Sequence, residues 1–140
     1  MKNTAAIVML LVLLGCQNKD SKTTTNTGTP KFEFQEEFYN FGSLQAGEVV
    51  SFSFGFSNSG DGTLIIEKVE ADCGCITIHF PEEPIAPGES DFIEVVFNSA
   101  GETGRIYKEI MVYANTQAPT AKLAIVATVN NELINLYSKN

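Results

Sequence analysis

Hydrophobic and polar residues alternate along most of the chain between residues 31 and 130. In the segment EVVSFSFGFSN, four apolar residues fall on one side of the alternation and small residues fall between them: Val50, Phe52, Phe54 and Phe56. A period of two places successive side chains on opposite faces of an extended strand, so this segment is predicted to be a half-buried β-strand. No helical period competes with this pattern inside the region.

The same alternation predicts eight strands separated by segments rich in Gly, Pro, Asn and Asp, which are typical of turns. Short antiparallel strands at this spacing, over roughly 100 residues, indicate an all-β, immunoglobulin-like β-sandwich of seven to eight strands. The chain contains no tryptophan, so it lacks the Cys–Trp–Cys framework of antibody domains, and we expect a core of Phe, Ile and Val. The expected strands are 31–35, 38–42, 48–57, 63–72, 75–80, 91–98, 105–115 and 121–130.

One expected strand changes its inward face partway along. In the segment TLIIEKVEADC, Leu64 and Ile66 occupy even positions, but Val69, Ala71 and Cys73 occupy odd ones. A β-bulge near residues 67–68 would produce this change. If the strand continues, Cys73 and Cys75 face inward and lie half-buried at one end of the sandwich.

The N-terminal segment predicts export and lipid attachment. The apolar run at residues 5–14 is too short to cross a bilayer as a helix and has the form of a signal-peptide core. It ends in Leu-Leu-Gly-Cys16, which resembles the lipobox of bacterial lipoproteins, where the cysteine thiol carries a diacylglycerol group. We therefore expect membrane attachment through acyl chains such as palmitate on Cys16. The alternative is an ordinary secretory signal followed by an incidental cysteine.

The segment after Cys16 predicts a flexible tether. Residues 17–30 include no aliphatic or aromatic side chain, so they cannot bury enough apolar surface to fold. The expected organisation is a signal peptide (1–15), a lipidated cysteine with its tether (16–30), one domain (31–130) and a C-terminal tail (131–140). Gln17 does not match the inner-membrane retention signal of enterobacterial lipoproteins, which favours the outer membrane and leaves the periplasmic or surface face open.

The charge of the chain argues against nucleic acid as a ligand. Seventeen acidic and nine basic residues give a formal net charge of −8, and the sequence contains no run of Lys or Arg. The tether carries only Lys19 and Lys22, too few for an electrostatic membrane patch. Membrane attachment is therefore expected to depend on the lipid.

The segment EADCGCITIHF raises the question of a metal or redox site at Cys73, Cys75 and His79. Two thiolates and an imidazole suit Cu(I) or zinc, but a structural zinc site takes four ligands, and an acidic residue such as Asp72 would have to complete it. A disulfide between the cysteines would close a small ring and could be static or redox-active. The interpretation we prefer has two reduced thiols as small packing residues, no cofactor, and His79 at the surface.

Motifs of common enzymes are absent from the sequence. It contains no nucleophile elbow, P-loop or H-E-x-x-H motif, and it has a single histidine, so we assign no catalytic residue and expect no enzyme. Aromatic residues are a better indication of function. Tyr107 and Tyr113 share the outward face of one expected strand with Met111, which is typical of a partner surface. Contact of these residues with the N-terminal strand or the tail NELINLY is the alternative.

Several motifs taken together resemble the bacterial domain of unknown function 1573 family. They are Phe41-Gly42, Gly47-Glu48, NSGDGTLII, Cys73-Gly74-Cys75, PIAPG and GETG. The resemblance implies an Ig-like domain of a kind often found in lipoproteins of Bacteroidetes. At the level of fold alone, the pattern is also similar to the major-sperm-protein-like domains of cilium and centrosome proteins.

The resemblance implies a fold and a location but no reaction, because the family has no assigned biochemical role. The leading hypothesis is a non-enzymatic, lipid-anchored module that binds protein or polysaccharide at the cell envelope. A lipoprotein that handles copper or zinc through Cys73 and Cys75, and a thiol redox accessory, are the alternatives.

Overall fold

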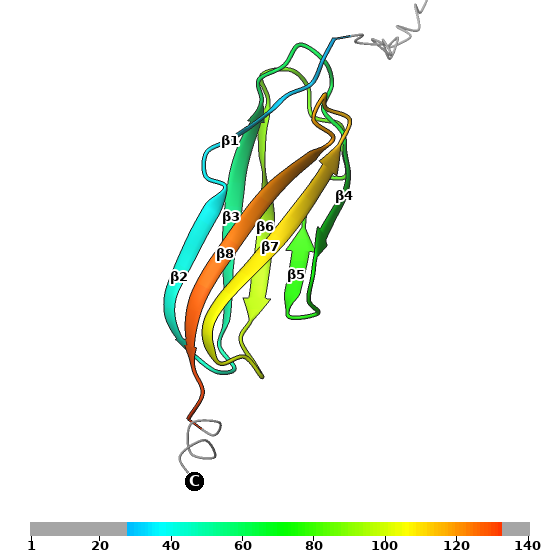
Figure 1. The fold of residues 1–140 in the computed structure, drawn as a ribbon. Helices are drawn as coiled ribbons and strands as arrows, with labels where there is room; N and C mark the ends of the chain where they lie inside the picture. Colours follow the sequence, from blue (N-terminus) through cyan, green and yellow to red (C-terminus); the bar gives the residue numbers. More distant parts are fainter. Residues whose placement is uncertain (1–27, 133–140) are drawn as a thin grey trace, which may run out of the picture.

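The computed structural model describes residues 28–132, and the predicted signal peptide, lipidation site and most of the C-terminal tail lie outside this range. The described residues form an all-β fold of eight strands (Figure 1), which confirms the predicted fold class. Within this range no helix has the length and apolarity needed to cross a membrane. The strands are β1 (Phe32–Phe34), β2 (Phe38–Gln45), β3 (Val49–Asn58), β4 (Ile66–Ala71), β5 (Ile76–His79), β6 (Ser90–Asn98), β7 (Gly104–Ala114) and β8 (Thr120–Asn130).

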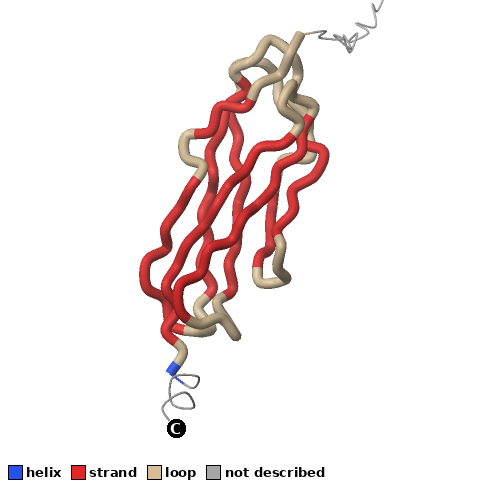
Figure 2. Tube along the Cα trace, in the orientation of Figure 1, coloured by secondary structure: helices blue, strands red, loops and turns tan. Residues whose placement is uncertain are grey.

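The strands form two four-stranded sheets that pack face to face (Figure 2). One sheet has the order β1-β3-β6-β5, and the other has the order β2-β8-β7-β4. All pairs are antiparallel except β2 and β8, which are parallel, so the expectation of a purely antiparallel sandwich is wrong for this pair. The cause is the short connection at residues 35–37. It moves the chain from the edge of one sheet to the edge of the other without reversing it.

The chain also changes sheets at the opposite edge of the sandwich. β4 is an edge strand of one sheet, β5 is an edge strand of the other, and only residues 72–75 connect them. Consequently, each lateral edge of the sandwich is formed by two strands that follow each other in the sequence, β1 and β2 at one edge and β4 and β5 at the other. The two predicted cysteines fall in the second of these crossings.

The inner faces of both sheets meet in a core of Phe, Ile, Val and Leu, as predicted. Phe54 and Phe56 of β3 are completely buried, and Tyr39 of β2 stacks on Phe52 across the two sheets with ring centroids 3.7 Å apart. The predicted inward residues of β7 are also buried, among them Ile110. The alternation in the sequence therefore assigns the faces of these strands correctly.

The change of face predicted near residues 67–68 is present as a shift in strand register. The pairing of β4 with β7 is irregular between Ile66 and Lys68, as expected for a β-bulge. Leu64 lies outside β4 and forms an isolated bridge to Ile85. The expected strand at 63–72 is therefore shorter in the structure, and Leu64 from its first part pairs with the loop before β6.

Two polar side chains in the described range are fully buried, at opposite ends of the sandwich. Asn58 donates from Nδ2 to the carbonyl oxygens of Gly62 and Ile85, at 2.7 and 3.0 Å. At the other end, Oγ of Ser99 donates to the carbonyl oxygen of Gln45 at 3.0 Å and accepts a hydrogen bond from the backbone N–H of Gly47 at 3.1 Å. Each buried side chain thus joins backbone groups of turns and strand ends at its end of the sandwich.

Candidate functional site

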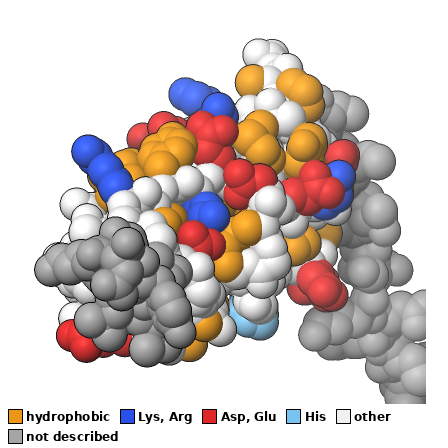
Figure 3. Space-filling view, turned by 60° about the horizontal axis from the view of Figure 1, so that its bottom comes forward, with side chains coloured by type: hydrophobic (Ala, Val, Ile, Leu, Met, Phe, Trp, Pro, Cys, Tyr) orange, Lys and Arg blue, Asp and Glu red, His pale blue; other side chains and the backbone are white. Residues whose placement is uncertain are grey.

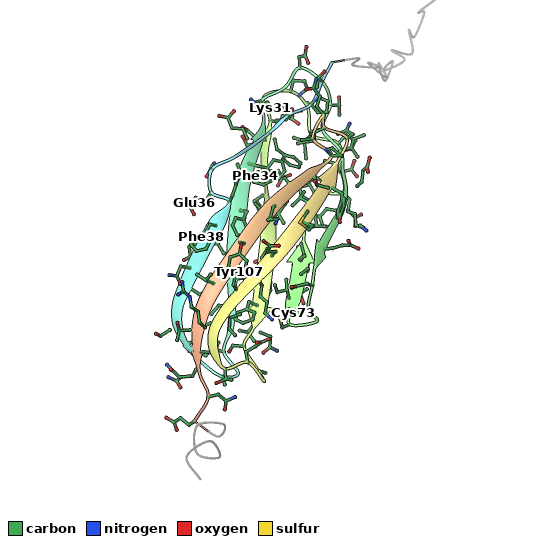
Figure 4. The ribbon with its side chains drawn as sticks, in the orientation of Figure 1. Lys31, Phe34, Glu36, Phe38, Cys73 and Tyr107 are labelled. Carbon is green, nitrogen blue, oxygen red and sulfur yellow. A yellow bond between two sulfur atoms is a disulfide. The ribbon has the colours of Figure 1, made fainter. Side chains whose placement is uncertain are left out.

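Cys73 and Cys75 lie in the turn between β4 and β5, where Figure 4 labels Cys73 at the lower end of the sandwich. The two residues are joined by a disulfide, and their Cα atoms are 5.2 Å apart. The preferred expectation of two reduced thiols is therefore wrong. In an extended strand these Cα atoms would be about 6.5–7 Å apart, near the limit for a disulfide, and the turn shortens this distance.

Gly74 does not provide a left-handed backbone conformation in this turn. It is absent from the glycines with positive φ, which include Gly47 at +97°. A Cβ atom added to Gly74 would have no heavy atom within 4 Å, and the residue is exposed. The bend that brings the two cysteines together therefore does not use the positive φ that glycine adopts more readily than other residues.

The disulfide has little to contribute to stability through chain entropy. The loop that it closes contains only three residues, because the cysteines are two positions apart. The loop-entropy relation gives about 1.6 kcal/mol for such a loop, compared with about 3 kcal/mol for a loop of 15 residues. A conventional structural disulfide would join more distant segments, as between the two sheets.

The expected metal ligands do not form a metal site in this structure. Across residues 28–132, no three His, Cys, Asp or Glu side chains are grouped so that they could hold an ion. His79 is exposed at the end of β5 and lies opposite Glu94 of β6. The sulfur atoms of Cys73 and Cys75 are bonded to each other, and zinc or Cu(I) would require them as thiolates.

A second candidate site is an apolar strip on the outer face of the β2-β8-β7-β4 sheet, which we call the Phe38–Tyr107 patch. It consists of Phe38, Ala124, Val126 and Tyr107. Phe38 of β2 pairs with Ala124 of β8, and Tyr107 of β7 pairs with Val126 of β8. The two aromatic residues are 52% and 55% exposed, and Ala124 and Val126 between them are buried.

Figure 4 places the labelled Phe38 and Tyr107 on the sheet that is turned toward the viewer. On the face turned forward in Figure 3, hydrophobic side chains form separate patches between charged side chains, with no continuous apolar belt. Phe38 and Tyr107 differ from a singly exposed hydrophobic residue because they flank further apolar residues on one sheet face, and such patches mark interaction sites.

A charged group borders the Phe38–Tyr107 patch. Lys122 donates from Nζ to Oε1 of Glu109 at 3.0 Å, and the hydroxyl of Tyr107 donates to the same oxygen at 3.2 Å. The hydrogen bond from Lys122, its positive charge and the Tyr107 hydroxyl together hold the pKa of Glu109 below its ordinary value. The Tyr107 ring is thus oriented by a polar contact while its face stays exposed.

The other predicted members of the partner surface are less accessible than Tyr107. Met111 and Tyr113 are half-buried. Lys68 lies over the Tyr113 ring, with Nζ 4.7 Å from its centroid, and forms an ion pair with Glu70 at 2.7 Å. The hydrogen bond to Glu70 is also the main reason that the pKa of Lys68 is raised. These contacts occupy Tyr113, so the accessible aromatic surface is centred on Tyr107 and Phe38.

Sequence reasoning missed Phe38, although the sequence contained the signal. Tyr39 and Phe41 have the parity of the core, and their rings make an edge contact with centroids 5.0 Å apart. Phe38 has the opposite parity, which it shares with Asn40, and should therefore have been assigned to the outer face.

A groove lies close to Phe38, at the edge where the chain crosses between the sheets. Its volume is about 510 Å³, and it is lined by the segment before β1, by β1 and by the loop before β8. Phe32 and Phe34 are among its apolar lining residues, and the charged residues Lys31 and Glu37 also line it. This groove was also missed, because it depends on β1 and β8 belonging to different sheets.

The fold recurs in proteins of different kinds. A Porphyromonas gingivalis protein of unknown function is similar with a TM-score of 0.62 and 22% identity, over 79% of this chain and 51% of that one. The chain thus spans about half the length of that protein. The PapD-like domain 7 of human CEP192 has a TM-score of 0.59 and 10% identity, over 74% of this chain and 87% of that domain.

A third similar structure is the VesB protease of Vibrio cholerae, with a TM-score of 0.54 and 15% identity, over 73% of this chain and 32% of the protease. At these identities the likenesses show the fold alone. No curated protein matched the sequence. The model of the family described as "Protein of unknown function (DUF1573)" matches residues 32–129, which is most of the described range. On this match, the chain belongs to the DUF1573 family.

Proposed function

We propose that this protein is a non-enzymatic, lipid-anchored module of the cell envelope that binds a protein partner through the Phe38–Tyr107 patch. The observation that carries the proposal is the exposure of Phe38 and Tyr107 on either side of an apolar strip. Protein interfaces typically have an apolar centre and a polar rim, and aromatic residues near the centre contribute much of the binding energy. Glu109 and Lys122 form part of that rim.

A protein is favoured over a polysaccharide as the partner. The patch lies on the outer face of a sheet, whereas the groove near Phe38 lies at the edge of the sandwich and includes β1 of the other sheet. An apolar sheet face with paired charges beside it suits another folded protein, because shape and charge can be matched over many residues. A polysaccharide that stacks on the aromatic rings is the competing possibility, and the experiment below separates the two.

The lipid anchor in the proposal is supported by the lipobox-like segment that ends in Cys16. Residues 17–30, fully extended, would reach about 45–50 Å, which is enough to hold the domain away from a membrane surface. The described chain begins at the end of the sandwich remote from the Cys73–Cys75 turn (Figure 1). The absence of an inner-membrane retention signal at Gln17 favours the outer membrane.

Site-specific photo-crosslinking in cells tests the binding surface. A photoreactive residue would replace Phe38 or Tyr107, and a matched control would replace Phe92, which is 51% exposed on the outer face of the other sheet. We expect one protein adduct at positions 38 and 107 and none at position 92. Equal adducts at all three positions, or none at 38 and 107, would contradict the proposal. An adduct that glycosidase treatment removes would assign the surface to a polysaccharide.

Mass spectrometry of the membrane fraction tests the anchor separately. We expect a mature N-terminus at Cys16 carrying a diacylglycerol group, and a Cys16→Ala chain that keeps Met1. Recovery of wild-type protein with an unmodified N-terminal residue would rule out lipid attachment and leave the binding surface to be judged on its own experiment.

A further inference from the structure

The Cys73–Cys75 disulfide closes a turn that depends on it very little. The bond spans only three residues, and the turn connects two edge strands that are held by their own ladders to β7 and β6. Reduction of the bond would therefore leave the sheets and the core in place. A disulfide that can open without unfolding the domain meets the first requirement of a redox-active pair.

The two cysteines differ in their surroundings. Cys75 packs against the hydrophobic core, and its carbonyl oxygen accepts a hydrogen bond of 2.9 Å from the backbone N–H of Asn98. Cys73 is half-buried and is not among the described residues that pack against the core. The neighbouring Gly74 is exposed and has open space around it. Of the two sulfurs, that of Cys73 therefore lies on the side away from the core, which is the side from which a thiolate would approach.

From this asymmetry we propose that Cys73–Cys75 is a reactive disulfide that oxidises dithiols of other proteins. A thiolate of the substrate attacks Sγ of Cys73 and forms a mixed disulfide. The original S–S bond breaks, and Cys75 leaves with the electron pair as a thiolate. The second substrate thiolate then attacks the substrate sulfur of the mixed disulfide and releases Cys73 as a thiolate.

The products of this exchange are one substrate disulfide and the reduced Cys73 and Cys75 pair. The substrate dithiol loses two electrons and two protons, and the cysteine pair takes up both. The cysteine turn is separate from the proposed binding surface. It follows β4, and Phe38 lies in β2, and these are the two opposite edge strands of one sheet.

A redox titration of the full-length chain tests the proposal. The Cys16→Ala background leaves Cys73 and Cys75 as the only thiols, and the purified protein would be equilibrated with mixtures of reduced and oxidised glutathione. Labelling with a maleimide mass tag then counts free thiols. We expect the pair to pass from bonded to reduced within the series, and one mole of oxidised protein to oxidise about one mole of a two-cysteine peptide. A pair that remains bonded in the most reducing mixture, or reduced in the most oxidising one, would overturn the proposal.

Single substitutions test the roles of the two sulfurs. The thiol of Cys73 in Cys75→Ser is expected to react with oxidised glutathione about tenfold faster than the thiol of Cys75 in Cys73→Ser. Circular dichroism would verify that both variants keep their β-structure, and the titration of the unsubstituted pair stands even if one variant does not fold. Equal rates in two folded variants would refute the assignment of Cys73 as the attacked sulfur. Ser substitutions at Phe38 and Tyr107 should leave the titration unchanged.

Discussion

Asn58 donates a hydrogen bond from Nδ2 to the carbonyl oxygen of Ile85, 27 positions further along the chain, at 3.0 Å. The same side chain donates to Gly62 and accepts from the backbone N–H groups of Lys31 and Gly60 at its oxygen. One buried amide thus joins the turn after β3, the segment before β1 and the loop before β6. The side chain adds to the few backbone hydrogen bonds between these segments, such as those from the Ser59 N–H to Lys31 and from the Gly88 N–H to Asn58.

Replacement of Asn58 by Ala should therefore destabilise the domain strongly. It would remove the side-chain partner of the Gly62 carbonyl and of the Lys31 and Gly60 N–H groups, whereas the Ile85 carbonyl keeps its bond from the Leu64 N–H. We expect a loss of about 3 kcal/mol in the free energy of unfolding, measured by urea denaturation. Asn115→Ala is the matched control, because Asn115 also binds two backbone groups but is exposed. Its loss should stay below about 1.5 kcal/mol, since water can replace the amide. Similar losses for both variants would show that burial of Asn58 is not the cause.

The core around β3 gives a second prediction. Phe54 is fully buried, so Phe54→Ala should cost about 3–5 kcal/mol, a large part of the total stability of a domain of this size. Ser53→Ala, on the exposed face of the same strand, should change the stability by less than about 0.5 kcal/mol. A loss below about 1 kcal/mol for Phe54→Ala in thermal or chemical denaturation would contradict the packing described above.

Two glycines with equally open surroundings allow the effect of backbone conformation on stability to be measured apart from the effect of steric space. Neither Gly74 nor Gly47 has a heavy atom within 4 Å of the position of an added Cβ, but only Gly47 has a positive φ, of +97°. Gly47→Ala should lower the stability by about 1 kcal/mol or more, because an L-residue is strained in that region. Gly74→Ala should be neutral or slightly stabilising. Comparison of the two midpoints of unfolding measures this difference, and a destabilised Gly74→Ala would show that the cysteine turn does require glycine.

The rim of the Phe38–Tyr107 patch gives a prediction about pH. The hydrogen bond from Lys122 is the largest cause of the lowered pKa of Glu109, so Lys122→Met should raise that pKa toward its ordinary value of 4.5. Tyr107→Phe should raise it less, because the hydroxyl is the smallest of the contributing causes. Titration of the Glu109 carboxyl carbon by NMR measures both shifts. A larger shift in Tyr107→Phe than in Lys122→Met would reverse the assigned order.

The sign of the linked stability follows from the same shift. A carboxylate whose pKa is lower in the folded state stabilises that state above its unfolded pKa, and this contribution is lost as the pH falls through the folded value. The wild-type protein should therefore lose slightly more stability than Lys122→Met on acidification below pH 4.5. Glu109 and Lys122 are largely exposed, so the difference should be small and should shrink in salt.

The strands could be predicted from the sequence because alternation is a local property. Each residue of a two-layer sandwich faces either the core or water, so the pattern in β3 and the change of parity at Ile66 appear directly in the sequence. The pairing of β2 with β8 could not be predicted in this way. Alternation determines which face a residue occupies, but it does not determine which strand lies next to it.

The candidate sites were predictable to different extents for the same reason. Parity placed Tyr107 on the outer face, where the structure has it, and would have placed Phe38 there too. The state of Cys73 and Cys75 depends on the backbone of four turn residues, and the sequence is compatible with either bonded or reduced sulfur atoms. The hydrogen bonds of Asn58 join segments 27 positions apart, which no local pattern reveals.

The parallel pairing of β2 with β8 has a mechanical consequence. β2 leads away from residue 28 at one end of the sandwich, and β8 leads toward residue 132 at the other end (Figure 1). A pulling force applied between these two residues would draw the strands past each other along their length. The hydrogen bonds of the ladder from Phe38–Ala124 to Gln45–Asn130 run between the strands at a slant, so this sliding would strain them together and would not open them one after another. A domain pulled at both ends of its chain would therefore resist the tension through shear of this strand pair.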